Sequence, residues 1–373
     1  QVPLKIICRN SEDLSDVKLR LTAAEIDTLK VDFHLTRDNR LWMRDHGATY
    51  TIHPKKGKRV ADFGWTMYGQ KEVLLTYYGG NLDSVNYHYK RSLGKTGLID
   101  SLMGAWDGSP AVKTDVNMEG GSIEVNGKGT LILCEAVTLQ RNPKLSKTYI
   151  ESEFRRVLGV SHIIWLKQGL AEDPLHFNQI YDKYYGWGTF GHTDEFVRFV
   201  NDSTLLLAWV DEAERNKHPI NEMNYYRMKE NLRILEQSRD QDGKRFKVIK
   251  VPLPDPIYLN TVIGRSRENN ISGELPQWKV AQNWLPEKGL MNPGDSINWV
   301  AASSYLNYLV TNGAVLLPTY QKSGSSGEKE AKVRDIFSRV FPDRKLIFLD
   351  VLNLNYHGGG IHCITQQEPA SPK

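Results

Sequence analysis

Short runs of alternating apolar and polar residues recur from one end of this chain to the other. Successive side chains of a strand point to opposite faces, so a period of two bounded by Gly, Asn or Asp predicts a strand with one buried face. The runs that fit are LKIIC, VDFHL, ATYTI, SIEVNGKGTLILCEA, HIIWL, EFVRFVNDSTLLLAWV, FKVIKVPL, AVLLP and LIFLDV. Asn126-Gly127 and Asn201-Asp202 predict the turns of two hairpins.

Helical spacing, with apolar residues three and four apart, separates these strands. It predicts helices over residues 83–105, 149–159, 221–238 and 328–341. Strands and helices therefore alternate, which is typical of an α/β fold. No long linker divides the chain, so residues 1–373 are expected to form a single catalytic domain. The stretch 260–298 is too long for a plain connection and predicts a lid or a substrate-shaping loop.

The alternation also has a coarse period. Strand ends rich in polar residues or glycine fall near Asp45, Glu119, His192, Ser303 and Cys363, and the first two intervals are each about 74 residues. Five such units predict a ring of ββα-type blades. In a ring the corners of all units can converge on one central site.

Composition and charge exclude several classes of protein. Hydrophobic residues make up 40% of the 373, enough for a large core, and the net charge of +4 is spread along the chain rather than clustered as nucleic-acid binding requires. No apolar run approaches the roughly 18 residues that cross a membrane. The three cysteines form no regular disulfide framework. A cytoplasmic protein is expected, with a mature secreted or periplasmic form as the alternative.

The corners hold the residues that could carry chemistry. Cys363 could act as a nucleophile and His192 as an acid and base, with Asp45, Glu119 and Asp194 as anionic walls. Several carboxylates around a thiol oppose the oxyanion that a cysteine protease must stabilise. They suit a cationic substrate instead. A guanidinium ion presents paired N–H donors that carboxylates accept, and its central carbon could face the sulfur.

Each residue also has a simpler interpretation. A lone cysteine on a strand is often a small buried hydrophobe, as expected for Cys8 and Cys134, and His192 with Asp194 could be a structural pair on one strand face. Zinc is a rival, because several residues are of ligand type, yet they form no tight zinc spacing. These residues are His357, His362, Cys363, His192 and Asp194. Neither glycine run is followed by the Lys-Ser/Thr of a phosphate loop.

Six motifs together resemble one family. LWMRDHGATYTI, DFGWTMYG, MEGGSIEVNGKGTLILCEAV, GHTDEFVRF, AASSYLNYLVTNG and GGGIHCITQQEPA look like the agmatine deiminase and bacterial peptidylarginine deiminase family. The resemblance runs from about Leu4 to Ala370 in the right order. It implies a guanidine-modifying enzyme with the five-bladed α/β propeller called the pentein fold, whose ββαβ-type units surround a central active site.

The resemblance also implies roles. Cys363 matches the nucleophile that attacks the guanidinium carbon, and His192 matches the general acid and base. Asp45 and Asp194 match the carboxylates that hold the guanidinium nitrogens, and Glu119 matches an acidic residue that orients His192 or lines the pocket. Trp42 is expected to pack on the alkyl chain of the substrate, and Gly360 to line the substrate site. No metal or organic cofactor is required.

Two departures from the family pattern stand out. Family members carry about fifty residues, with a Trp-Pro-bearing strand, before the stretch that matches LKIICRN, so the first blade is expected to lack its N-terminal strand. Glu195 stands in GHTDEF where agmatine deiminases commonly have Asn.

The expected activity is hydrolysis of a guanidino compound without a cofactor. Agmatine, giving N-carbamoylputrescine and ammonia, is the first candidate substrate, and a peptidyl arginine, giving peptidyl citrulline, is the second. An amidinotransferase and a non-catalytic guanidinium-binding protein are remoter alternatives. No nucleic-acid or membrane partner is expected, and a homodimer is left open.

Overall fold

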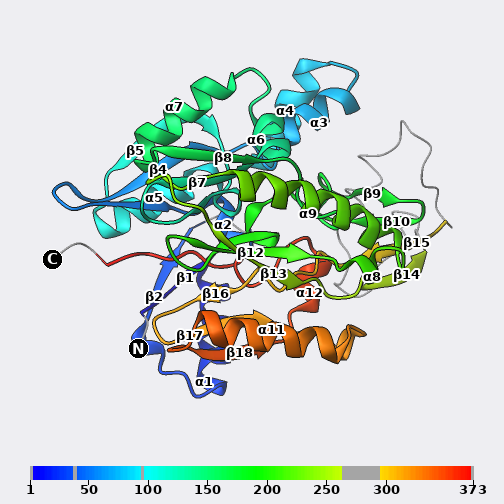
Figure 1. Cartoon of the computed structure of the whole chain (residues 1–373). Coiled ribbons are helices and arrows are strands. Elements are labelled where there is room, and N and C mark those ends of the chain that lie inside the picture. The colour runs from blue at the N-terminus through cyan, green and yellow to red at the C-terminus, as the bar shows by residue number, and fades with distance from the viewer. Residues whose placement is uncertain (1–2, 37–39, 94–95, 263–294, 371–373) are drawn as a thin grey trace.

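The computed structural model describes residues 3–36, 40–93, 96–262 and 295–370. Within these residues the strands form four three-stranded sheets, one two-stranded sheet and one four-stranded sheet. Figure 1 shows these sheets one above another, from β4 and β5 near the top to β17 and β18 near the bottom, with helices packed outside them. We call each three-stranded sheet with its connecting helices a blade.

The four blades share one topology. Their first two strands are antiparallel, and the third returns parallel to the middle strand. The strands are, blade by blade, β3 (Thr49–His53), β4 (Gly57–Gly64) and β5 (Ala111–Asn117); β6 (Glu124–Val125), β7 (Thr130–Cys134) and β8 (His162–Leu166); β11 (Val197–Phe199), β12 (Thr204–Trp209) and β13 (Lys247–Pro252); β16 (Leu309–Val310), β17 (Ala314–Pro318) and β18 (Lys345–Leu349).

Helices connect the middle and third strands, as a parallel crossover requires. They are α3 (Gln70–Tyr77), α4 (Leu82–Leu93) and α5 (Ile99–Asp107) in the first blade, α6 (Glu135–Arg141) and α7 (Lys147–Leu158) in the next, then α8 (Glu212–Arg215) and α9 (Pro219–Gln237), and α11 (Gly327–Val340). Short helices elsewhere are α2 (Met43–His46), α12 (Leu352–Tyr356) and the 3₁₀ turns η1 (Thr28–Lys30), η2 (Thr96–Leu98), η3 (Gly120–Ser122), η4 (Thr193–Glu195) and η6 (Gln321–Ser323).

The helix α7 illustrates how the sequence fixes a crossover. The side chain of Ser146 accepts the N–H of Tyr149 at the start, and Gly159 ends the helix with a φ of 71°. Ile150, Phe154 and Val157, spaced by four and three residues, are its buried positions. They pack into a core cluster with strands of two neighbouring blades.

The remaining strands form two further sheets. β1 (Leu4–Cys8) and β2 (Val31–Leu35) are parallel and joined by α1 (Ser11–Ala23), so they repeat the parallel half of a blade. The second sheet has the order β14 (Tyr258–Val262), β15 (Ser296–Val300), β10 (Tyr184–Gly186) and β9 (Asn178–Tyr181). Of the predicted lid over residues 260–298, the two ends form β14 and β15, and residues 263–294 lie outside the described residues.

Most predicted strands and both predicted hairpins are confirmed. The single helix predicted over residues 83–105 is wrong, because α4 ends at Leu93 and α5 begins at Ile99 after the turn η2. Glycines at 94 and 97 fall inside this interval and disfavour a continuous helix. None of the described helices is long and apolar enough to cross a membrane.

Candidate active site

The corners predicted from the sequence meet in one buried place. His192, on the turn that begins η4, has Nδ1 3.5 Å from Asp45 Oδ1 and Nε2 3.3 Å from Glu119 Oε2. The thiol of Cys363 donates to Asp194 Oδ2 at 3.6 Å. The predicted residues Cys363, His192, Asp194, Asp45 and Glu119 are all 5% exposed or less. The structure therefore brings the whole predicted acid, base and thiol set together.

The local structure around these residues differs from the prediction. His192 and Asp194 do not lie on one strand face; they belong to the 3₁₀ turn η4 and its N-terminal cap. Cys363 lies in a turn after α12 rather than on a strand. The glycine before His192 has a φ of 118° and ends any extended run, so the chain turns at the corner.

The charge of His192 depends on two carboxylates. Burial would lower the pKa of His192, but Asp45 and Glu119 outweigh it and raise the pKa to about 9. Burial would likewise raise the pKa of Glu119, but Arg141, whose Nε donates to both of its oxygens at 2.9 and 3.1 Å, and His192 lower it to about 2. The imidazole is therefore protonated at neutral pH and held against a charged Glu119.

A buried carboxylate holds the His192 turn in place. Asp173 accepts the backbone N–H groups of Gly191 at 2.8 Å and His192 at 3.0 Å, and it accepts the N–H and the hydroxyl of Thr189 as well. Asp173 is 4% exposed. Four donors converging on one carboxylate fix the backbone that carries the imidazole.

A strained turn supports Asp45. Met67 and Tyr68 have φ values of 55° and 60°, in the left-handed region that non-glycine residues rarely adopt. The turn directs the hydroxyl of Tyr68 to donate to Asp45 Oδ2 at 2.8 Å, and the N–H of Gly121 donates to Asp45 Oδ1 at 3.2 Å. Burial raises the pKa of Asp45 above its usual value, which makes these donors important for keeping it charged.

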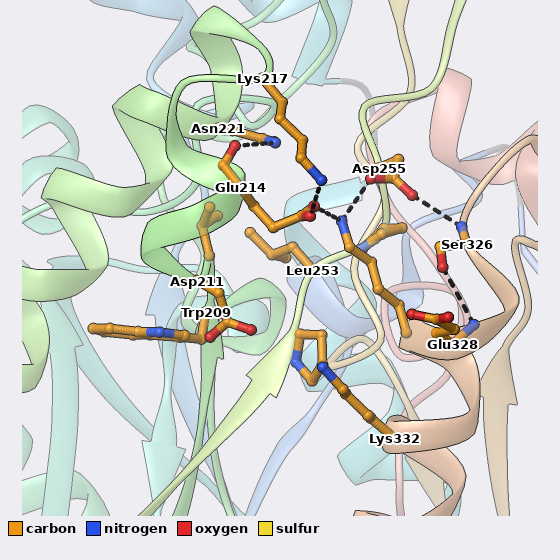
Figure 2. A pocket seen from close by; sticks show the side chains of 14 residues that line it. Trp209, Asp211, Glu214, Lys217, Asn221, Leu253, Asp255, Ser326, Glu328 and Lys332 are labelled. Carbon is orange, nitrogen blue, oxygen red and sulfur yellow. Dashed lines mark hydrogen bonds and ion pairs between the residues drawn. The ribbon is translucent and has the colours of Figure 1, made fainter.

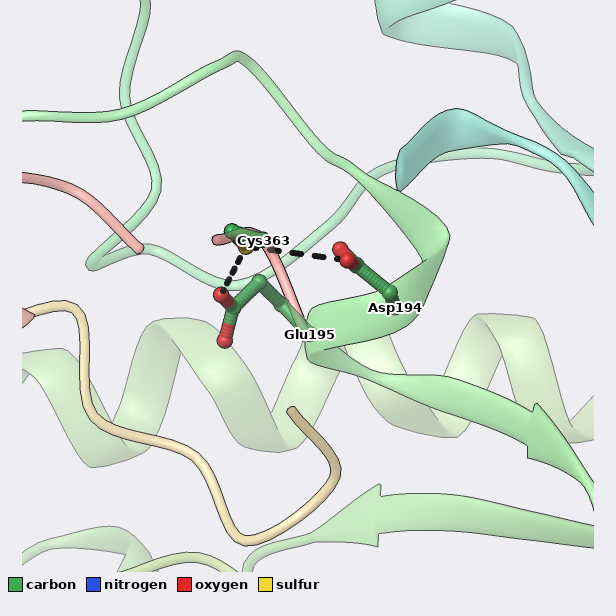
Figure 3. A group of neighbouring side chains, drawn as sticks. All are labelled: Asp194, Glu195 and Cys363. Atoms are coloured by element: carbon green, nitrogen blue, oxygen red, sulfur yellow. Dashed lines mark hydrogen bonds between the residues drawn. The ribbon is translucent and has the colours of Figure 1, made fainter. Parts of the chain in front are cut away.

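The sulfur of Cys363 is surrounded by acidic groups (Figure 3). Its thiol donates to Asp194 Oδ2 at 3.6 Å and to Glu195 Oε1 at 3.8 Å, while Asn307 Nδ2 donates to the sulfur at 3.0 Å. Burial, followed by the charges of Asp194 and Glu195, raises the pKa of Cys363 well above its ordinary value. The thiol is therefore neutral until a cation enters.

In the described structure, one carboxyl oxygen of Asp194 is hydrogen-bonded and the other has no hydrogen-bond partner. His362 Nδ1 lies 2.6 Å from Oδ2, and burial together with Arg198 and Arg44 lowers the pKa of His362, so the neutral imidazole donates its Nδ1–H. Asp194 Oδ1 is buried without a hydrogen-bond partner in the described structure. A buried carboxylate oxygen is costly to leave unpaired, so it marks a place for a donor from outside.

Glycine at position 121 lets the backbone pack directly against the polar groups of the site. A Cβ atom at Gly121 would lie 2.5 Å from His192 Nδ1, 2.8 Å from Asp45 Oδ1 and 3.2 Å from Asp194 Oδ2. Any side chain here would thus collide with the imidazole and with both carboxylates. The absence of a Cβ at this position therefore allows His192, Asp45 and Asp194 to converge on one point of the backbone.

The glycine run before Cys363 has a different use. A Cβ at Gly359 would lie 2.7 Å from the Trp42 ring, and one at Gly360 would lie 2.6 Å from Asn307 Oδ1. Gly360 thus gives Asn307 room to reach the thiol, and Trp42, partly buried, covers the Gly359 backbone. The predicted roles of Trp42 and Gly360 toward a substrate stay predictions, and the described contact of Gly360 is with Asn307.

The other thiols and the zinc rival fit the structure less well. Cys8 and Cys134 are buried in β1 and β7, and burial raises the pKa of Cys134 to about 12. His357 Nδ1 donates to Asn353 O at 2.7 Å, apart from the thiol. In the described part of the chain, the three residues that could share a metal ion are Asp194, Glu195 and Cys363, which is not the set proposed from the sequence.

Sequence reasoning missed five supporting residues: Asn307, Asp173, Arg141, Tyr68 and His362 as a donor to Asp194. Asn307 and Tyr68 lie inside motifs already singled out, so their polar side chains within apolar stretches were an available signal. Asp173 and Arg141 lie outside those motifs, and their contacts depend on how the blades are arranged.

A separate hollow of about 280 Å³ lies between α8, the end of β13 and the start of α11 (Figure 2). Its charges are largely paired: Lys329 bridges Glu214 at 2.8 Å and Asp255 at 2.6 Å, and Lys217 lies 2.5 Å from Glu214. It contains no residue of the thiol site. The hollow is therefore separate from the candidate site at Cys363.

Comparison with known proteins supports the resemblance noted in the sequence. Agmatine deiminase of Pseudomonas aeruginosa (strain LESB58) is 30% identical to this chain over 373 residues, covering 98% of this chain and 83% of that protein. Agmatine deiminase of Ectopseudomonas mendocina (strain ymp) is 29% identical, covering 98% and 82%.

Solved structures carry the same fold. An agmatine deiminase of Enterococcus faecalis superposes with a TM-score of 0.68 at 23% identity, covering 99% of this chain and 83% of that one. A C. jejuni agmatine deiminase superposes with a TM-score of 0.60 at 20% identity, covering 97% and 80%. The predicted α/β propeller is thereby confirmed. The sequence profile of the Porphyromonas-type peptidyl-arginine deiminases matches residues 1–369, and the chain belongs to that family.

Proposed function

We propose that this protein is a deiminase that hydrolyses the guanidinium group of agmatine to N-carbamoylputrescine and ammonia. Cys363 is the nucleophile, and His192 is the general acid and base. Asp45 and Asp194 hold the guanidinium nitrogens, and Glu119 orients His192. Trp42 packs against the alkyl chain of the substrate, and the backbone at Gly360 borders the site next to the thiol.

The observation that carries the proposal is an oxygen of Asp194 that has no hydrogen-bond partner and lies beside a thiol. Among the described residues Asp194 Oδ1 has no partner, and the thiol lies 3.6 Å from Oδ2 of the same carboxylate. A guanidinium ion would supply N–H donors to that oxygen and a positive charge to a site walled by carboxylates. A neutral amide would supply no charge, and an anion would supply neither. Both carboxylates and His192 converge at the backbone of Gly121.

The arrangement supports a two-stage reaction. The thiolate attacks the guanidinium carbon to form a tetrahedral adduct, and His192, protonated at neutral pH, gives its proton to the departing nitrogen, which leaves as ammonia. The neutral imidazole then takes a proton from water as that water attacks the S-amidino intermediate. The C–S bond breaks, and the ureido product leaves.

Peptidyl arginine is the second candidate, because the matching family is described as peptidyl-arginine deiminases. A peptide that ends in arginine carries an extra carboxylate, which would need a cationic partner. Arg44, the buried arginine nearest in sequence to Asp45, already donates to His362 O and Gln367. The agmatine side chain ends instead in an amine, and agmatine is the substrate named for the relatives most similar in sequence among those above.

The test compares agmatine, free arginine and a peptide ending in arginine, with ammonia and ureido product both measured. We expect ammonia and N-carbamoylputrescine from agmatine in equal amounts. Product from the peptide alone would favour the second candidate, and ureido product replaced by a transferred amidino group would identify an amidinotransferase. No ammonia from any of the three would contradict a deiminase.

A further inference from the structure

The carboxyl group of Glu195 shares a hydrogen-bond donor with the catalytic sulfur. Asn307 Nδ2 donates to Glu195 Oε1 at 2.8 Å and to Cys363 Sγ at 3.0 Å, and the thiol donates to the same Glu195 oxygen at 3.8 Å. Figure 3 shows Glu195 and Asp194 approaching the sulfur from different sides. Glu195 is 4% exposed, so its carboxyl group lies in the reaction space rather than in solvent.

The thiol must lose a proton before it can attack, and few groups are in reach of that proton. His192 is not one of them: its ring nitrogens face Asp45 and Glu119, and no hydrogen bond joins it to Cys363 in the described residues. Asp194 Oδ2 lies 3.6 Å away but already accepts from His362. Burial raises the pKa of Asp194 to about 7, but a bound guanidinium ion would keep it charged, because a protonated Asp194 would present a donor where the cation needs an acceptor.

We propose that Glu195 accepts the proton of the Cys363 thiol when the cationic substrate binds. This inference rests on the proposed deiminase function. The S–H bond breaks, an O–H bond forms on Glu195, and the electron pair stays on sulfur for the attack. When the C–S bond of the intermediate breaks, the leaving sulfur takes the proton back. Asn307 stays bound to both partners through this exchange.

The surroundings of Glu195 favour its neutral form. Burial, followed by the charge of Asp194, raises the pKa of Glu195 well above its usual value. The titratable groups that face it are Asp194, Asp173, Cys363, Asp45 and Tyr320. All of these are acids, so a proton on Glu195 relieves repulsion. Before the transfer, the neutral thiol of Cys363 lies next to the charged carboxylate of Glu195. After it, the thiolate lies next to a neutral carboxylic acid.

A proton that moves within the site leaves a distinctive pH dependence. If Glu195 keeps the proton, the fraction of thiolate in the cation complex does not depend on solvent pH while the pair holds a single proton. If the proton must leave for solvent, the thiolate fraction rises about tenfold per pH unit below the thiol pKa. Glu195→Gln keeps the size of the side chain and an oxygen for Asn307 but cannot take the proton.

The experiment measures the ultraviolet absorbance of the Cys363 thiolate with guanidinium chloride, at sub-denaturing concentration, as the probe. Cys363→Ala supplies the baseline. From pH 6 to pH 8 we expect the wild-type signal to change less than about twofold and the Glu195→Gln signal to rise about tenfold per unit. Glu172→Gln, which alters another buried glutamate, bonded to Asn224, is the matched control and should follow the wild type.

Equal pH dependence in wild type and Glu195→Gln would overturn the proposal, and so would the absence of thiolate in both. Circular dichroism checks the fold of each variant. If Glu195→Gln does not fold, Glu195→Asn takes its place, because its side chain is also neutral. We expect the same rise of the thiolate signal with pH in that variant. The thiolate absorbance can be measured without turnover. A result against Glu195 can therefore be told apart from a failure of the proposed function, which would appear as no ammonia from agmatine.

Discussion

At the scale of single residues, the site works by giving similar groups different charges. Glu119 stays ionised because Arg141 donates to it, whereas Glu195 is surrounded by acids and holds a proton more strongly. Asp194 keeps one oxygen for His362 and leaves the other bare. In the proposed reaction, three carboxyl groups of nearly equal intrinsic acidity therefore take different roles: Glu119 orients the base, Glu195 takes a proton and Asp194 holds the cation.

The raised pKa of His192 predicts an alkaline limit to activity. The imidazole must be protonated to give ammonia its proton, and its pKa is about 9, so kcat should fall as pH rises through about 9. Because the folded pKa is raised, the same interaction stabilises the fold fully below the ordinary pKa of 6.5. That stability is lost between pH 6.5 and about 9. Steady-state kinetics and denaturant unfolding across this range provide the measurement; a kcat unchanged to well above pH 9 would contradict the assignment.

Cys363→Ala should abolish turnover and keep binding. The substitution removes the nucleophile but leaves Asp45, and the bare oxygen of Asp194, to hold the cation. Calorimetry with agmatine should give a Kd within about tenfold of the wild-type value, or about 1.4 kcal/mol. Residual turnover in this variant would exclude Cys363 as the nucleophile.

Gly121→Ala should remove activity with little effect on distant structure. Its Cβ would lie 2.5 Å from His192 Nδ1, so the imidazole would have to move. We expect kcat/KM to fall at least about a hundredfold, since displacing reacting groups by an ångström has that effect. Gly313→Ala is the matched control, because a Cβ there meets no atom within 4 Å. Equal activity in both variants would show that turnover does not depend on the position of His192 against Gly121.

At the scale of elements, the catalytic groups lie on turns that side chains hold in place. η4 places His192 and Asp194, and Asp173 fixes the backbone just before it; the turn at Met67 and Tyr68 supports Asp45. Turns can take backbone conformations that strands and helices cannot, so they position side chains more freely. This also explains why the simpler interpretation, a pair of His192 and Asp194 on one strand face, is wrong.

Asp173→Asn should slow catalysis without removing the fold. An amide has one acceptor oxygen, so it cannot accept the N–H groups of both Thr189 and Gly191 as the carboxylate does through its two oxygens. We expect kcat to fall about tenfold to a hundredfold with KM nearly unchanged, as for loss of a group that orients a catalytic residue. Glu172→Gln, next to it and also buried, is the control. A variant that raised KM alone would contradict a role through His192.

The sequence predicted elements best where apolar residues fill a segment or one of its faces. It predicted them least well where pairing with a neighbouring strand defines the element. β12 is a continuous apolar run in which the successive positions 205–208 are all buried, and the spacing in α7 is strong because one side of that helix packs into the core. β4 and β5 were not predicted: their polar positions, such as Asp62 and Lys113, mask the alternation, and pairing between the two strands defines them. The candidate site residues, such as His192 and Cys363, were found through their motifs, whereas the positions of Asp173 and Arg141 depend on contacts between blades.

At the scale of the whole molecule, the end of the described chain returns to its beginning. Glu368 accepts from Lys5 Nζ on β1 at 2.6 Å and from Lys58 Nζ on β4 at 2.8 Å, and the N–H of Arg44 donates to Cys363 O at 2.9 Å. In Figure 1 the red C-terminal segment passes beside the blue strand β1. These contacts join the corner of Cys363 to that of Asp45.

Glu368→Gln should weaken this closure. Lys58 would keep its ion pair with Asp107 at 2.6 Å, and Lys5 would lose its described partner. Because Glu368 is partly exposed, we expect the free energy of unfolding to fall by about 1 kcal/mol, and by less at high salt. Denaturant unfolding at two salt concentrations checks this. Glu328→Gln, on a different surface, is the control; an equal loss in both variants would argue against a specific closure.

The site draws its acids from early in the chain and its sulfur from position 363, after all four blades have been formed. During synthesis, a nascent chain therefore carries Asp45, Glu119 and His192 before it carries Cys363. On the proposed function, a chain released before position 363 would have the acidic groups and the imidazole but no nucleophile, so it could not turn over substrate.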